Sequence, residues 1–163
     1  MNITALKTYL EELSEKHKSI CHSSTQKHFW ADIDELMDEI KGKATSPIVV
    51  MGPPAFEPVD DAKDNVQERN TLSILILTYV KPRAGIKADQ TNAYDTCKIL
   101  ANDFMSYMLN DERELQNGIL LTNPNNFRVE LAGPIMDNYY GVELFIEFND
   151  ALDLSFDPDK WNE

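Results

Sequence analysis

Four residues that could bind a metal ion gather near the N-terminus: His17, Cys21, His22 and His28. Imidazole and thiolate groups are zinc ligands, and the i, i+4 spacing of His17 and Cys21 would place two of them on one helix face. A structural zinc site needs four ligands, usually in two closely spaced pairs, and the sequence contains no second Cys/His pair. We therefore expect a polar helix end with histidines in it rather than a metal centre.

The acidic clusters do not match a calcium loop either. Asp32 and Asp34, like Asp157 and Asp159, lack the central glycine and terminal glutamate that such a loop requires. Asp32 and Asp34 instead fall where a helix should start, a position that favours acids. There is no Gly-x-Ser-x-Gly elbow, and Gly52 is followed by two prolines rather than by a phosphate-binding Lys-Ser/Thr pair. The sequence predicts no catalytic residues, no cofactor and no metal.

The elements that would position any site belong to one domain. The chain has 163 residues, a length typical of one domain, so residues 1–163 are expected to form a single α+β domain. Its net charge is −13. This acidity argues against specific nucleic-acid binding and against docking on anionic membranes. The negative charge is concentrated in two places. The predicted long loop 52–70 has a net charge of −3. The final segment 143–163, which includes the acidic end of the chain at 149–163, has a net charge of −6.

Hydrophobic periodicity predicts the order α-α-β-β-α-β-β, a mainly antiparallel four-stranded sheet packed against helices. Strand 71–80 is apolar on both faces and should be central in the sheet. Cys97 falls on the apolar face of helix 91–109 and should be buried. The predicted elements are helices 4–18, 29–42 and 91–109, strands 47–51, 71–80, 127–131 and 142–148, and the connecting loops 52–70 and 132–141.

Nothing in the sequence indicates secretion or a membrane span. The first residues lack the basic and apolar regions of a signal peptide, and the longest apolar run, 72–80, is far shorter than a membrane helix. Two cysteines 76 positions apart form no disulfide framework. We expect a soluble protein made in a reducing cytoplasm.

Two exposed segments carry aromatic groups that could bind a neighbouring protein. The connection 132–141 contains Met136, Asp137, Tyr139 and Tyr140, and the loop 52–70 contains Phe56. Tyrosine and methionine are enriched at interface cores. The alternative, given equal weight for the tyrosines, is that these side chains fold back onto their own sheet.

The chain resembles small phage tail-terminator, tail-completion or head–tail-joining proteins, of the kind found in phages and prophages of Bacteroides-like hosts. Besides the element order, the resemblance rests on the segments Leu131–Pro134, Asp137–Phe148 and Leu152–Trp161. It covers most of the chain as topology but only about residues 127–161 as sequence pattern.

The resemblance implies a structural subunit that forms a ring, possibly a hexamer, with itself and contacts other tail or neck proteins, first in the host cytoplasm and then in the virion. DNA must pass such a ring without being held, so acids facing the lumen would repel its phosphates. The candidates are Glu57, Asp60, Asp61 and Asp64. The alternative function is a small immunity-type binding module whose acidic surface docks a basic partner.

Overall fold

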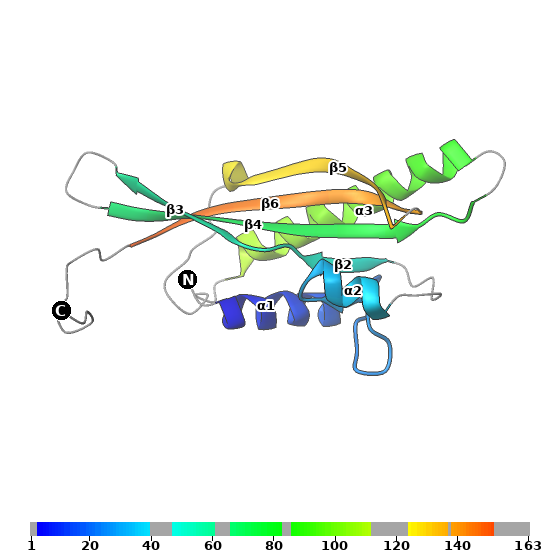
Figure 1. Cartoon of the computed structure of the whole chain (residues 1–163), viewed down its shortest axis with the longest axis horizontal. Coiled ribbons are helices and arrows are strands. Elements are labelled where there is room, and N and C mark those ends of the chain that lie inside the picture. The colour runs from blue at the N-terminus through cyan, green and yellow to red at the C-terminus, as the bar shows by residue number, and fades with distance from the viewer. Residues whose placement is uncertain are drawn as a thin grey trace.

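The computed structural model describes residues 3–39, 47–60, 66–82, 86–111, 124–136 and 138–151. Three helices and six strands follow one another in the order α-β-α-β-β-β-α-β-β, with one 3-10 turn before the fifth strand (Figure 1). They are α1 (Ile3–Lys16), β1 (Phe29–Trp30), α2 (Ile33–Glu39), β2 (Ile48–Met51), β3 (Ala55–Asp60), β4 (Val66–Tyr79), α3 (Ile86–Asn110), η1 (Pro124–Asn126), β5 (Phe127–Ile135) and β6 (Tyr139–Ala151).

The strands form one mixed, mostly antiparallel sheet in the order β1-β2-β4-β6-β5, with β3 attached to β4 beside this path. Only the β1–β2 pair is parallel among the described strands. The α+β class is confirmed, whereas the prediction of four strands is wrong because β1 and β3 also join the sheet. The central place of β4 is confirmed: it pairs with β6 along one edge and with β2 and β3 along the other.

The main core lies on the sheet face covered by α1 and α3. Leu10 from α1 and Phe104 from α3 pack there against β4 and β6, and Cys97 is fully buried as expected. A smaller cluster occupies the opposite face, where α2 and Trp30 cover Ile48, Val50 and Leu77. Each face of β4 therefore buries alternate side chains under a different helix.

Residues 52–70 do not form the long loop that the sequence predicts. β3 and the first half of β4 form a hairpin in which Phe56 pairs with Asn70 and Glu57 with Arg69. Because this hairpin is largely exposed, its strands lack the alternation of apolar and polar residues that predicts a strand, and its acids and prolines look like those of a loop. Pro58 is tolerated because β3 lies at an edge of the sheet, where a missing N–H breaks no ladder.

Two other boundaries differ from prediction. Phe29 and Trp30 form β1, and the helix starts only after Asp32, whose Oδ1 accepts a hydrogen bond from the Glu35 N–H at 2.7 Å. The connection 132–141 is mostly strand, because β5 runs to Ile135 and β6 begins at Tyr139. A turn with Met136 at φ 48° joins them. Helix 91–109 and strands 47–51, 71–80, 127–131 and 142–148 are confirmed within one to several residues at each end.

None of the described helices is both long and apolar enough to cross a membrane.

Candidate functional site

The most distinctive surface is a three-stranded extension that we call the strand arm. It consists of β3 (Ala55–Asp60), the start of β4 (Val66–Thr71) and the end of β6 (Glu147–Ala151). The arm projects beyond both α1 and the end of α3 (Figure 1). In the described part of the chain β3 pairs with β4 alone, so its outer edge offers unpaired backbone groups.

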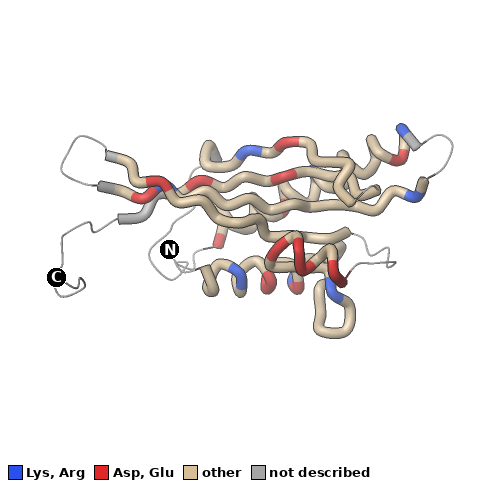
Figure 2. Tube along the Cα trace, viewed as in Figure 1, with Lys and Arg blue, Asp and Glu red and all other residues tan. Residues whose placement is uncertain are grey.

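The arm is acidic and carries an exposed aromatic ring. Its three strand segments contain five acids and one base, Arg69. Figure 2 shows some of these acids in red along the arm. Arg69 Nη1 lies 3.8 Å from Glu57 Oε2, and both side chains are largely exposed. Phe56, which precedes Glu57 on β3 and pairs with Asn70, is 44% exposed. An aromatic ring with an acidic surround suits contact with another protein rather than with nucleic acid.

Asn70 lies at the root of the arm and is fully buried. Its Nδ2 donates to the carbonyl of Glu68 at 3.1 Å, but its buried Oδ1 accepts no hydrogen bond from the residues that the structure describes. A buried amide oxygen without a donor costs about 1–3 kcal/mol. The junction between arm and core is therefore less well satisfied than the core itself.

The structure places the predicted interface residues and the candidate lumen-facing acids in two separate regions. Phe56 and Glu57 lie on the arm, Asp60 ends β3, and Asp61, Asp64 and Asp137 lie outside the described residues. Met136, Tyr139 and Tyr140 lie at the other end of β6, where Tyr139 pairs with Tyr79. Gln67 in the arm and Tyr79 are 12 positions apart on β4, which corresponds to about 40 Å.

The two tyrosines are core residues. Tyr139 is 4% exposed, and its ring lies 5.4 Å from that of Tyr79 between centroids. Burial raises the pKa of Tyr139, and the neighbouring Tyr79 adds to this effect. Tyr140 is 8% exposed and makes an edge contact with Tyr94. Of the two alternatives that the sequence left open, the burial of both tyrosines favours packing onto their own sheet. Met136 is partly buried and packs against the same cluster as Tyr139.

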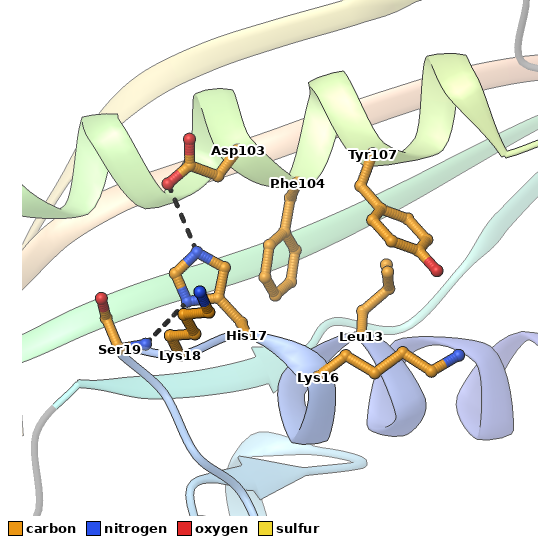
Figure 3. Close-up of a pocket in the computed structure, with 8 residues that line it drawn as sticks. All are labelled: Leu13, Lys16, His17, Lys18, Ser19, Asp103, Phe104 and Tyr107. Atoms are coloured by element: carbon orange, nitrogen blue, oxygen red, sulfur yellow. Dashed lines mark hydrogen bonds and ion pairs between the residues drawn. The ribbon is translucent and has the colours of Figure 1, made fainter.

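A hollow of about 420 Å³ lies between the end of α1 and α3 (Figure 3). The Ser19 N–H donates to His17 Nδ1 at 3.2 Å, so this nitrogen carries no proton. His17 Nε2 then donates to Asp103 Oδ2 at 3.3 Å. Both ring nitrogens of His17 therefore have hydrogen-bond partners within the chain. Sequence reasoning missed this pair because the two residues are 86 positions apart.

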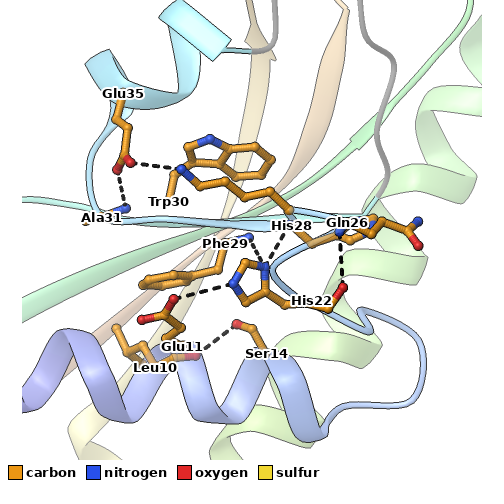
Figure 4. A network of polar contacts seen from close by, with 12 residues as sticks. Leu10, Glu11, Ser14, His22, Gln26, His28, Phe29, Trp30, Ala31 and Glu35 are labelled. Carbon is orange, nitrogen blue, oxygen red and sulfur yellow. Dashed lines mark hydrogen bonds and ion pairs between the residues drawn. The ribbon is translucent and has the colours of Figure 1, made fainter.

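The other histidines serve as structural acceptors and donors (Figure 4). His22 Nδ1 accepts the backbone N–H groups of His28 and Phe29 at 2.9 and 3.2 Å, and its Nε2 faces Glu11 at 3.5 Å. His28 Nδ1 lies 2.6 Å from the carbonyl oxygen of Pro47, to which it donates. These bonds fasten the segment after α1 to β1 and to the start of β2.

The three histidines and Cys21 thus contact separate partners. Cys21 is exposed, and its Sγ lies 2.7 Å from the carbonyl oxygen of Lys18. Within the described ranges, no group of three or more His, Cys, Asp or Glu side chains could hold a metal ion.

A second acidic surface surrounds α2. Its acids are held partly by one cation, because Lys27 Nζ lies 2.8 Å from Glu35 Oε1 and 3.0 Å from Glu39 Oε2. The hydrogen bond from Lys27 lowers the pKa of Glu35, although partial burial opposes this shift. Partial burial disfavours the charge of Lys27, but the two carboxylates outweigh it and raise the pKa of Lys27. Asp34 stays exposed on the same helix.

In comparisons with known proteins, no family model matches this chain and no curated protein is significantly similar to it in sequence.

Proposed function

We propose that this protein is a non-enzymatic structural subunit of a phage tail or neck, as a tail terminator, tail-completion or head–tail-joining protein. It would assemble as a ring, with a hexamer as the working size, and contact other tail or neck proteins. The observation that carries the proposal is the strand arm, which extends beyond the helices and exposes Phe56 and the outer edge of β3, where no described strand pairs.

A ring needs two different complementary surfaces on each subunit, because its contacts run head to tail. The arm is well separated from the opposite end of β4, so one subunit could reach the next through it. Backbone groups on the outer edge of β3 would supply hydrogen bonds, and Phe56 would supply a buried anchor.

The acids of the arm fit a ring through which DNA passes. Glu57 and Asp60 lie on the arm, and Asp61 and Asp64 follow in the chain before β4 begins. If they face the lumen, their charges repel phosphates and reduce friction. Acids found only on the outer rim of an assembled ring would contradict this part of the proposal.

Size-exclusion chromatography with light scattering tests the assembly, with the protein alone and with purified tail tubes. We expect a closed oligomer in at least one condition and its loss in Phe56→Ser. Ile99→Ser is the matched control, because Ile99 is exposed on α3 outside the arm. A protein that stays monomeric in both conditions, or equal loss in both variants, would contradict the proposal.

The acidic surface around α2 favours one alternative function, a binding module that docks a basic protein. A tight one-to-one complex that Asp34→Lys abolishes and Phe56→Ser leaves intact would support this alternative over the ring.

A further inference from the structure

β5 is an open edge of the sheet. It pairs with β6 through Phe127–Ala132, and within the described residues its other edge has no strand beside it. The open stretch is bounded by η1 on one side and by the register shift between Ala132 and Ile135 on the other, where Pro134 lacks an N–H. Unpaired backbone groups over such a stretch are a template for another strand.

The face of β5 directed at the helices has an uncovered apolar residue. Phe127, Val129 and Leu131 alternate along this face, opposite Ile146, Leu144 and Val142 of β6. Phe127 and Val129 pack against the main core, but Leu131 is 71% exposed, the highest value among the exposed large apolar side chains described. The chain's own helices therefore leave this end of the stripe open to water.

The opposite face of β5 carries one charge of each sign. Arg128 Nε lies 3.3 Å from Glu130 Oε1 on the same strand, and the guanidinium lies 4.5 Å from the centre of the Phe145 ring. Glu130 stands directly opposite Glu143 of β6. Like charges in that position are destabilising, so a cation on the outer side of Glu130 would be favoured.

We propose that β5 pairs antiparallel with β5 of a second copy, around a two-fold axis at Val129. The segment Phe127-Arg128-Val129-Glu130-Leu131 is complementary to itself in this register. Arg128 meets Glu130 of the second copy, and Glu130 meets Arg128. On the other face, Phe127 meets Leu131 of the second copy, so the exposed Leu131 of each copy is covered by Phe127 of the other.

Neighbouring registers lack this match. An axis at Arg128 or at Glu130 sets like charges against each other. A shift of half a position pairs Arg128 with Val129, which lie on opposite faces of the sheet. The charge pattern therefore selects a second copy of this chain, in one register, as the occupant of the edge.

The contact is short, so it is a weak, concentration-dependent dimer rather than an obligate one. It does not depend on the proposed function, because it uses β5 and not the strand arm. If both contacts form, the two-fold contact joins rings in pairs, as in dihedral assemblies.

Charge reversal tests the register by sedimentation velocity across a concentration series of the full chain. Arg128→Glu and Glu130→Arg each place like charges across the axis at both symmetric positions. We expect each to raise the dimer dissociation constant by about tenfold or more. Combining both substitutions in one chain restores complementarity and should restore the dimer.

Mixing the two single variants gives the sharpest outcome. One chain then presents only acids and the other only bases at positions 128 and 130, so a mixed dimer should form, which native mass spectrometry resolves by mass. Lys16→Glu is the control, because it reverses an exposed cation of another intrachain pair and should leave the dimer unchanged.

Three results would overturn the proposal: a wild-type chain without self-association, single reversals that associate like wild type, or folded double and mixed samples that do not recover. Circular dichroism establishes folding in each case. A ring formed through the arm would persist in the single variants, so its presence or absence is read separately from the two-fold contact.

Discussion

The two halves of β4 belong to one strand but have different surroundings. From Leu72 onward, side chains such as Ile74 and Ile76 are completely buried between helices and neighbouring strands. Before Thr71 the same strand runs through the arm, where β3 replaces β2 as neighbour and Arg69 is exposed.

The two halves of β4 therefore differ in what they contribute to stability. The covered half gains free energy from apolar burial, at about 25 cal/mol per Å². In the arm half Asn70 is buried but Arg69 is exposed, and β3, which pairs with β4 there, has no strand on its outer edge among the described residues. Substitutions in the covered half should therefore unfold the protein, whereas those in the arm should change its contacts.

The largest expected effect is that of Ile76→Asp. Ile76 is fully buried in the centre of the sheet, where an unpaired carboxylate is strongly unfavourable. Folded proteins are typically stable by only about 5–15 kcal/mol, so we expect this variant to be largely unfolded. Urea unfolding followed by circular dichroism measures this. Gln67→Asp, on the arm half of β4, is the control and should fold. Equal losses in both variants would remove the distinction between the two halves.

Replacing Tyr139 and Tyr140 together by serine should destabilise the fold by several kcal/mol. From the sequence both tyrosines are candidate interface residues whose loss would leave the monomer folded, with core packing as the alternative. In the structure each is nearly buried, and removing a buried aromatic ring typically costs about 3–5 kcal/mol. Thermal unfolding measures the loss. A double variant with wild-type stability and weaker assembly would contradict the core assignment and indicate that these residues belong to an interface.

Much of the covered half was predictable from the sequence. Helix 91–109 and the strands around Ile74 and Leu144 have strong local periodicity, which the core then confirms. The arm was missed because alternation is hard to see when both faces are exposed and prolines interrupt it. β1 was missed because two residues gain strand character only from pairing with Val49 and Val50.

The candidate surfaces were predictable only in part. Phe56 and Glu57 were singled out, but as loop residues, so the open edge of β3 beside them went unseen. The Phe127–Leu131 pattern was visible, yet its significance depends on strand order, which leaves β5 outermost. The pairing of His17 with Asp103 joins distant segments and has no local signal.

Gly141→Ala should destabilise the covered half by about 3 kcal/mol. A Cβ at this position would lie 2.0 Å from the Ile76 carbonyl oxygen, which belongs to the neighbouring strand and cannot move aside without breaking the ladder. Gly52→Ala is the matched control, because its closest contact, the Ser73 hydroxyl, can rotate away. Urea unfolding compares the two, and a larger loss in Gly52→Ala would contradict the reasoning.

The smallest expected effect is the pH dependence of the stability that the ion pair between Glu35 of α2 and Lys27 contributes. The pKa of Glu35 is lowered in the folded state, chiefly by Lys27, so its contribution is present above the ordinary value of 4.5 and is lost as the pH falls through the folded pKa. The pKa of Lys27 is raised above 10.5, so the pair persists up to alkaline pH.

Glu35→Gln should therefore reduce stability by less than about 1 kcal/mol at pH 7, because both side chains are more than a third exposed and water screens the pair. Towards pH 3 the difference in stability between the variant and the wild type should shrink, because the Glu35 carboxyl group loses its charge as the pH falls through its lowered folded-state pKa. Thermal melts at the two pH values measure this, with Glu15→Gln, an exposed acid of α1, as control. A difference that is as large at pH 3 as at pH 7 would mean that Glu35 stabilises α2 by packing rather than by its charge.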